Sequence, residues 1–236
     1  AKEKKKFAVK LMKEQKSVKT VLEKIGKIKG RLRKISTKYV AGKKTKEVLY
    51  KENNCVFRFN IDSTYFSPRL SNERREIAAK IKQGEKVLVM FAGVAPFPIV
   101  IAKNSKAKKV VAVELNKVAN KYARLNVELN KLKNRVEIIQ GDVKKVVGKL
   151  KEKFDVIVMP RPQLKDSFLK EAFKLCKRGT RVYYYDFSKE EERDLIVMKI
   201  KSEASKCKKR VKIIKVKKAG EIAPYKYRFR VDFRVL

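Results

Sequence analysis

The sequence contains no histidine among its 236 residues. This absence excludes serine–histidine triads and acid–base catalysis by imidazole, and it removes a ligand that most catalytic zinc sites use. Cysteine is scarce as well, since Cys55, Cys176 and Cys207 are an odd number at wide spacing. They match neither a disulfide framework nor a CxxC metal site, so we expect reduced thiols and no metal centre.

Long apolar runs are also missing. The longest uncharged segment, residues 87–102, is interrupted by Gly93, Pro96 and Pro98, and it is shorter than the roughly 18 apolar residues of a membrane span. The opening residues, AKEKKKF, lack the apolar segment of a signal peptide. We therefore expect a soluble cytoplasmic protein that does not contact membranes.

Acidic residues are few. The chain has 25 Asp and Glu against 64 Lys and Arg, a net charge of +39, and its isoelectric point is about 10.2. This surplus favours a polyanionic partner, with nucleic acid ahead of a membrane surface. A lysine-rich thermophile surface is the alternative, but glutamate is then enriched together with lysine, and here it is not.

From residue 87 onward, short apolar runs alternate with amphipathic segments, which is typical of a parallel sheet covered by helices. The pattern predicts strands at residues 87–91, 109–114, 135–140, 154–159 and 180–187. It predicts helices at residues 116–130 and 166–177, one after the turn at Gly93, and one that Ser188 caps and KEEERD begins. Two further strands, at residues 211–216 and 225–235, are expected to form an antiparallel edge.

The residues before this region have a different composition. A lysine-rich helical opening leads through Gly26 and Gly30 into strand-like runs at residues 31–39, 47–50 and 56–61. Pro68 then breaks the chain, and the stretch after Ser71 has a helical pattern. We predict a small N-terminal module at residues 1–66, helical at first and then β-rich, followed by an α/β domain at residues 67–236.

The segment VLVMFAGVAPFPI predicts a buried strand that enters a glycine-containing turn and then a helix. Such a loop at the carboxyl end of a strand lets backbone N–H groups approach a cofactor, although neither GxGxxG nor a P-loop is present. Glu114 closes the next strand, where a partner for ribose hydroxyls is expected. Asp142 follows the third strand, where a carboxylate can accept a hydrogen bond from an adenine amino group. Three such features after three successive strands favour a cofactor site over ordinary turns.

This order of features resembles the class I S-adenosylmethionine-dependent methyltransferases. More specifically, YFSPRLSNERREIA and MFAGVAPF, with YKENN upstream and VYYYDF downstream, resemble the archaeal and eukaryotic tRNA (guanine-N1)-methyltransferases that act at position 37, beside the anticodon. The resemblance extends from about Ser17 to the C-terminus, and the family's separate N-terminal docking domain has no counterpart in it. It implies a Rossmann-like methyltransferase domain, S-adenosylmethionine as cofactor, tRNA as partner, and a monomeric cytoplasmic enzyme of archaeal type.

The resemblance also implies roles for individual residues. Guanine N1 carries a proton at neutral pH, so its methylation requires a base, and charge on O6 requires a donor. The resemblance places the base on Glu73 and the O6 donor on Arg33, whereas from the residues alone Glu73 is a helix first-turn carboxylate and Arg33 a solvated strand residue. The implied cofactor-binding residues are Phe91, Ala92, Gly93, Val94, Glu114, Leu115, Asp142, Val143 and Met159. The implied substrate-binding residues are Tyr65, Arg69, Pro160, Arg161 and Pro162.

Three positions depart from the family pattern. Val89 replaces an acid of the first strand, Ala95 replaces a glycine, and Pro160 occupies the asparagine position of Asn-Leu-Pro or Asn-Pro-Pro. A proline there resembles the archaeal branch that makes wyosine derivatives, in which some members methylate both guanine N1 and a carbon of the tricyclic intermediate. Two alternatives stay open. One is the aminocarboxypropyl transferase of wybutosine synthesis, against which Arg69-Leu70 and Glu73-Arg74 count. The other is a non-catalytic basic RNA-binding protein.

Overall fold

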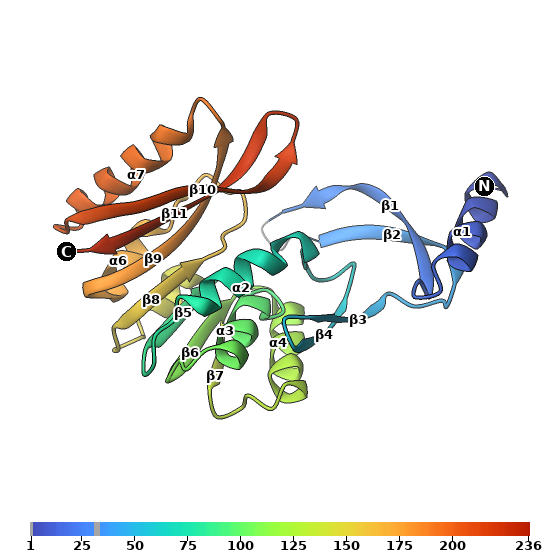
Figure 1. The fold of residues 1–236 in the computed structure, drawn as a ribbon, viewed down its shortest axis with the longest axis horizontal. Coiled ribbons are helices and arrows are strands. Elements are labelled where there is room, and N and C mark those ends of the chain that lie inside the picture. The colour runs from blue at the N-terminus through green and yellow to red at the C-terminus, as the bar shows by residue number, and fades with distance from the viewer. Residues whose placement is uncertain (1, 31–33) are drawn as a thin grey trace.

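The computed structural model describes residues 2–30 and 34–236. At its centre lies a seven-stranded sheet of order β10-β11-β9-β8-β5-β6-β7 (Figure 1). The parallel strands are β5 (Lys86–Met90), β6 (Lys109–Glu114), β7 (Val136–Gln140), β8 (Phe154–Met159) and β9 (Cys176–Lys189). An antiparallel edge follows, formed by β10 (Val211–Ala223) and β11 (Lys226–Val235). The predicted α/β fold, with its parallel strands and antiparallel edge, is confirmed.

Helices cover both faces of this sheet (Figure 1). On one face lie α2 (Ser71–Ala79), α3 (Pro96–Asn104) and α4 (Lys117–Leu129). On the other lie α5 (Val143–Val147), α6 (Leu169–Leu175) and α7 (Arg193–Lys206). The central strands are therefore apolar on both sides, as strands buried on both faces must be. In β5, for example, Val89 packs into one core and Leu88 into the other.

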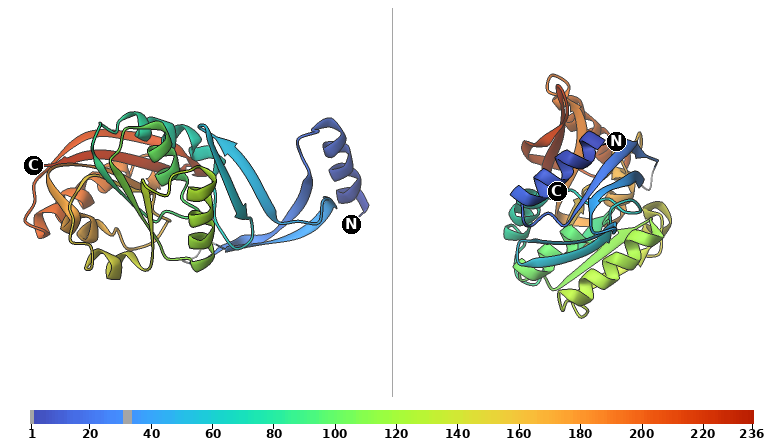
Figure 2. Two further views of the ribbon diagram at one scale, coloured as in Figure 1. Left: turned by 90° about the horizontal axis from the view of Figure 1, so that it is seen from below. Right: turned by 90° about the vertical axis from the view of Figure 1, so that its right-hand side faces the viewer.

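The N-terminal part comprises two hairpins and one helix. The helix α1 (Lys2–Glu14) and the hairpin of β1 (Thr20–Lys29) and β2 (Lys34–Gly42) project away from the sheet (Figure 2). The second hairpin, β3 (Glu47–Glu52) and β4 (Cys55–Asn60), is different, because Phe57 and Phe59 belong to the core beneath α3 and α4. A 3₁₀ turn, η1 (Pro68–Leu70), then leads into α2. The division at residue 66 stays a prediction.

Asn126 of α4 and Asn130, the C-cap residue of that helix, bind the backbone of β4. The Asn126 amide accepts from the Arg58 N–H at 2.7 Å and donates to the Arg58 carbonyl at 3.1 Å. Asn130 does the same at Val56, at 2.9 and 2.7 Å. The distance between the two asparagines matches the distance between Val56 and Arg58, because four helical residues rise about 6 Å and two strand residues rise about 6.6 Å. Asn126 also donates to the Val94 carbonyl at 3.0 Å, so it ties the hairpin to the loop after β5.

Three local expectations are wrong. Ser188 does not cap a helix, because β9 continues to pair with β11 as far as Lys189, and α7 begins at Arg193. The helix predicted at residues 166–177 is shorter, since the Asp166 carboxylate accepts from the Phe168 N–H before the helix begins and β9 begins directly after it. The lysine-rich opening is expected to be helical before the strand-like runs begin, but residues 20–29 form strand β1. Across residues 2–30 and 34–236, none of the helices is long and apolar enough to span a membrane.

Candidate active site

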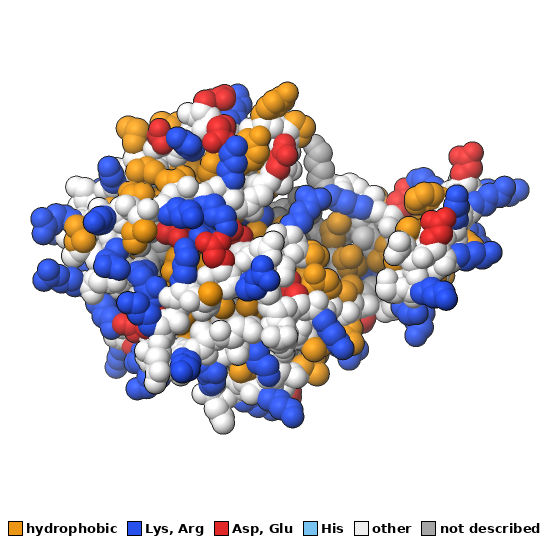
Figure 3. Space-filling model, viewed as in Figure 1, with side chains coloured by type: hydrophobic (Ala, Val, Ile, Leu, Met, Phe, Trp, Pro, Cys, Tyr) orange, Lys and Arg blue, Asp and Glu red, His pale blue; other side chains and the backbone are white. Residues whose placement is uncertain are grey.

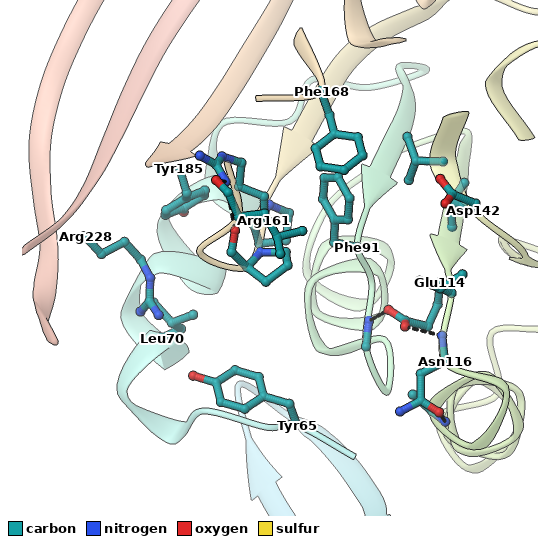
Figure 4. A pocket seen from close by; sticks show the side chains of 18 residues that line it. Tyr65, Leu70, Phe91, Glu114, Asn116, Asp142, Arg161, Phe168, Tyr185 and Arg228 are labelled. Atoms are coloured by element: carbon teal, nitrogen blue, oxygen red, sulfur yellow. Dashed lines mark hydrogen bonds between the residues drawn. The ribbon is translucent and has the colours of Figure 1, made fainter. Parts of the chain in front are cut away.

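A pocket lies at the carboxyl ends of the parallel strands, where the strand order reverses between β5 and β8 (Figure 4). Ligands of open α/β sheets bind at this position. Its cavity volume, the space open to a water-sized sphere, is about 100 Å³. Ten residues implied by the resemblance line it: Tyr65, Phe91, Gly93, Glu114, Leu115, Asp142, Val143, Pro160, Arg161 and Pro162.

The loop between β5 and α3 forms one wall through an unusual backbone path. Phe91, Gly93 and Ala95 all have left-handed backbone angles, with φ of 64°, 59° and 66°. Glycine adopts this conformation without steric cost, whereas Phe91 and Ala95 each pay on the order of 1 kcal/mol. The left-handed angle at Ala95 explains why a glycine suits this position in the family. The path turns the Gly93 N–H toward Glu114.

Glu114 joins this loop to the start of α4 (Figure 4). Its Oε2 accepts from the Gly93 N–H at 2.6 Å, and its Oε1 accepts from the Asn116 N–H at 2.7 Å. Burial raises the pKa of Glu114, although the backbone hydrogen bonds work in the opposite direction. A carboxylate has about four acceptor positions. The remaining acceptor capacity of Glu114 can therefore take hydroxyl donors of a ligand.

Asp142 and two phenylalanines complete this side of the pocket. The Asp142 carboxylate accepts from the Lys144 N–H at 3.0 Å and thereby caps α5. The Phe91 and Phe168 rings meet edge to face, with centroids 4.9 Å apart. Val143 is almost fully buried beside them. The result is an apolar slot with a carboxylate at its rim, which suits a flat heteroaromatic ring that carries a hydrogen-bond donor.

Arg161 is held inside the protein. Its Nη2 pairs with the Asp186 carboxylate at 2.7 Å, and its Nη1 donates to the carbonyls of Pro162 and Leu164 at 2.9 and 3.1 Å. The side chain is 2% exposed. The guanidinium therefore fixes the loop after β8, which also presents Pro160 and Pro162 to the pocket. A direct contact of Arg161 with substrate stays a prediction.

Glu73 lies in a buried cluster of charges between α2 and the antiparallel edge. Its Oε2 accepts from the Tyr185 hydroxyl at 2.9 Å and from Arg230 Nη1 at 2.6 Å, and its Oε1 is 2.8 Å from Lys217 Nζ. Arg230, which is fully buried, also binds Glu76. Tyr185 is one of the residues that line the pocket, and Glu73 is not among those found there in the described part of the chain.

Other implied residues lie elsewhere. Ala92, Val94 and Met159 are buried behind the pocket wall, and Arg69 is exposed on η1. Arg33 lies outside the described residues. Eight lining residues are not implied by the sequence: Leu70, Val113, Asn116, Ala119, Leu164, Phe168, Tyr185 and Arg228. Asn116 follows Glu114 so closely that the strand-to-helix turn is a usable signal for it. Tyr185 of β9 belongs to the VYYYDF segment that carries part of the resemblance, so a signal for it is present, although three consecutive tyrosines do not show which one lines the pocket. Arg228 comes from β11, and nothing local in the sequence relates it to the pocket.

The described residues contain no cluster of metal ligands, and the thiols of Cys55 and Cys176 are not reactive. Within residues 2–30 and 34–236, no group of three or more Cys, Asp or Glu side chains is placed to hold a metal ion. Burial raises the pKa of the Cys55 thiol to about 11 and that of Cys176 to about 12. Both thiols are therefore protonated at neutral pH and are poor nucleophiles.

Comparison with known proteins gives one consistent family. The model of the TRM5/TYW2 methyltransferase domain matches residues 48–214. The tRNA (guanine(37)-N(1))/4-demethylwyosine(37)-methyltransferase Taw22 of Nanoarchaeum equitans is 33% identical, over 98% of this chain and 93% of that protein. Trm5b of Pyrococcus abyssi, a tRNA (guanine(37)-N(1))-methyltransferase, is 34% identical over 93% of this chain and 65% of its own length.

Solved structures agree with these matches. The crystal structure of Pyrococcus abyssi Trm5b has a TM-score of 0.88 at 33% identity, covering 98% of this chain and 68% of that chain. The structure of M. jannaschii TYW2 in complex with AdoMet has a TM-score of 0.74 at 30% identity, covering 84% and 90%. This chain thus spans about two thirds of the length of Trm5b. The likeness includes the class I methyltransferase sheet, and the chain belongs to the TRM5/TYW2 methyltransferase family.

Proposed function

We propose that this chain is an S-adenosylmethionine-dependent methyltransferase that acts on N1 of guanine at position 37 of tRNA. The observation that carries the proposal is one pocket with two chemically different sides (Figure 4). Glu114, Asn116 and Asp142 lie on one side. Tyr65, Tyr185 and Arg228 lie on the other, and the Tyr185 hydroxyl donates to Glu73. The names of the relatives support the choice of tRNA and of position 37.

The residues on the Glu114 side fit S-adenosylmethionine. Beside its backbone donors at Gly93, Leu115 and Asn116, Glu114 keeps acceptor capacity that suits a ribose hydroxyl. Asp142 at the rim of the apolar slot suits the adenine amino group. Phe91, Gly93, Leu115 and Val143, which line the pocket, are proposed to contact the nucleoside. The support from the relatives is that one of them was solved in complex with AdoMet. When bound, the cofactor supplies an electrophilic methyl group on sulfur. Val89 packs into the core, so other groups must contact the methionine moiety.

The opposite side suits a nucleotide of RNA. Arg228 is half-buried in the pocket wall and brings a positive charge to the side where Tyr65 lies (Figure 4). Lys and Arg side chains are spread over the face seen in Figure 3, including the projecting part that carries α1. We assign removal of the N1 proton to the buried charge cluster around Glu73. Arg33 is kept as the proposed hydrogen-bond donor to O6. A cytoplasmic monomer, with residues 1–66 as a separate module, completes the proposal.

A second substrate is favoured by one residue. Pro160 lines the pocket where many family members have asparagine, so a backbone carbonyl replaces a side-chain amide. The Nanoarchaeum relative is named for both guanine and 4-demethylwyosine. We propose that a tricyclic wyosine precursor also fits this pocket.

The test is to incubate the protein with methyl-labelled cofactor and tRNA that carries either guanine or 4-demethylwyosine at position 37, and then to digest the RNA and identify the nucleoside at that position by mass as well as by label. N1-methylguanosine at position 37 supports the proposal. An unlabelled aminocarboxypropyl group on 4-demethylwyosine identifies the sister reaction, and tRNA binding without modification of either substrate identifies an RNA-binding protein. Glu73→Gln should lower the single-turnover rate by roughly 10²- to 10⁴-fold, the usual contribution of a general base. Calorimetric cofactor affinity should stay unchanged, because Glu73 is not on the cofactor side.

A further inference from the structure

Tyr185 connects the pocket with the carboxylate expected to act as base. Tyr185 lines the pocket, and its hydroxyl donates to Oε2 of Glu73 at 2.9 Å. Glu73 itself is 5% exposed and is not among the described residues of the wall. Of the three side chains that bind Glu73 through the contacts given above, Tyr185, Arg230 and Lys217, Tyr185 is the one that also lines the pocket.

The contacts of Glu73 argue against its moving to the substrate. Arg230 and Lys217 bind its two oxygens at 2.6 and 2.8 Å. Arg230 is in turn fixed by Glu76 at 2.7 Å and by Asp232 at 2.6 Å. If the Glu73 carboxylate swung into the pocket, the buried Arg230 would lose one of its partners, which is costly in a protein interior. Arg230 and Lys217 therefore hold the Glu73 carboxylate in place, and the Tyr185 hydroxyl is the group that can connect this carboxylate with a substrate in the pocket.

We propose that Tyr185 relays the proton from guanine N1 to Glu73 during methyl transfer. This inference rests on the proposed function. The N1–H bond breaks and its proton passes to the Tyr185 oxygen, while the proton of the Tyr185 hydroxyl passes to Oε2 of Glu73. The electron pair left on N1 forms the bond to the methyl carbon, and the pair of the carbon–sulfur bond stays on sulfur. Tyr185 is thus a catalytic residue, and Arg230 and Lys217 are positioning residues.

The state of the hydroxyl agrees with a relay. Burial, together with the negative charge of Glu73, raises the pKa of Tyr185 well above its ordinary value. The hydroxyl is therefore protonated at neutral pH, and it can accept one proton only as it gives up another. A tyrosinate that waited for substrate would be disfavoured here.

The first test compares Tyr185→Phe with Tyr183→Phe. Both tyrosines are buried in β9, two residues apart and on the same face. With saturating cofactor and tRNA, Tyr185→Phe should lower the single-turnover rate by roughly 10²-fold or more, while Tyr183→Phe should keep it. The double variant Tyr185→Phe/Glu73→Gln should be no slower than the slower single variant, because the two groups act as one unit. Cofactor affinity, measured by calorimetry, should be unchanged in both single variants.

Two measurements on the wild type separate a relay from a merely structural hydroxyl. In mixtures of light and heavy water, a relay moves two protons, so the rate should depend on the deuterium fraction along a curve, whereas one proton gives a line. In a crystal structure with tRNA and sinefungin, the Tyr185 oxygen should lie within hydrogen-bonding distance of N1 of the target guanine.

The outcomes distinguish this inference from the function beneath it. Three results would overturn the relay and leave the methyltransferase proposal intact. They are a Glu73 carboxylate in contact with guanine N1 in the complex, a linear dependence of the rate on the deuterium fraction, and a near-wild-type rate for Tyr185→Phe when Glu73→Gln is slow. If the wild type labels no guanine N1, the proposed function fails and the relay fails with it.

Discussion

Arg74 and Glu52 form a two-pronged ion pair whose side chains are only 1% and 4% exposed. Arg74 Nη2 lies 2.7 Å from Oε2 of Glu52 and also donates to the Ser67 carbonyl at 3.0 Å. The guanidinium lies over the Phe66 ring, 5.1 Å from its centroid. The pair fastens α2, which carries Glu73, to the β3–β4 hairpin.

Removing one partner of this ion pair should lower the free energy of unfolding far more than replacing both partners by apolar residues. Arg74→Ala leaves Glu52 buried without a counter-charge and should lower the free energy of unfolding by about 3–5 kcal/mol. Arg74→Met with Glu52→Leu leaves no unpaired charge and should lose much less. Denaturant unfolding of the two proteins checks this, and equal losses would show that the charges are not the cause.

Glu114 should control cofactor affinity. Glu114→Ala should raise the cofactor Kd, with a loss of about 1–3 kcal/mol of binding free energy, because ligand hydroxyls would lose their acceptor. Since burial raises the pKa of Glu114, its carboxylate is lost at a higher pH than that of an ordinary glutamate. Wild-type affinity should therefore fall as the pH is lowered, and Glu114→Gln should show a weaker but flatter profile. Glu137→Gln, an exposed acid of β7, is the matched control for calorimetry.

The Arg230 cluster should make stability sensitive to acid. Hydrogen bonds from Arg230, helped by Lys217, hold the pKa of Glu76 well below its usual range. Its stabilising contribution is therefore complete above a pH of about 4.3, the ordinary pKa of glutamate, and is lost as the pH falls toward the lowered value. Urea midpoints of the wild type should drop over this acid range. Glu76→Gln should be less stable at neutral pH and should lose less on acidification; parallel curves would contradict the assignment.

The surplus of positive charge should appear in the salt dependence of tRNA binding. Each neutralised phosphate contributes a slope of about −0.9 on duplex and about −0.7 on single strand to a plot of log affinity against log salt. We expect a steep slope in filter-binding titrations across a range of salt concentrations. An affinity that ignores salt would mean that the lysines serve another purpose.

Arg228 should matter more to catalysis or tRNA binding than Arg234, an arginine of the same strand that lies away from the pocket. Arg228→Ala should lower the single-turnover rate or the tRNA affinity, and Arg228→Lys should restore only part, because a point charge replaces a planar fork of donors. Arg234→Ala is the control, since Arg234 is exposed on β11 and is not one of the residues that line the pocket. Equal effects of the two alanine variants would make Arg228 an ordinary surface cation.

The sequence predicts best what neighbouring residues determine. Residues 109–114 and 154–159 are strands with the expected bounds, because strands buried on both faces have continuous apolar runs. Glu114 and Asp142 meet at the pocket because parallel strands end at the same edge. Tyr185 and Arg228 could not be placed this way. Their positions depend on the pairing of β9 with β11, which sets Tyr185 opposite Arg230 and Phe187 opposite Arg228.

The amides of Asn126 and Asn130 have a consequence for how this protein meets other chains. A strand with unpaired N–H and carbonyl groups along one side is a template for addition of a foreign strand, and proteins usually block it with lysine, proline or a bulge. At Val56 and Arg58 of β4 those groups are already taken by side chains of α4. A helix thus does the work of a neighbouring strand, and intermolecular β-pairing, the first step toward aggregation, is blocked along this side of the hairpin.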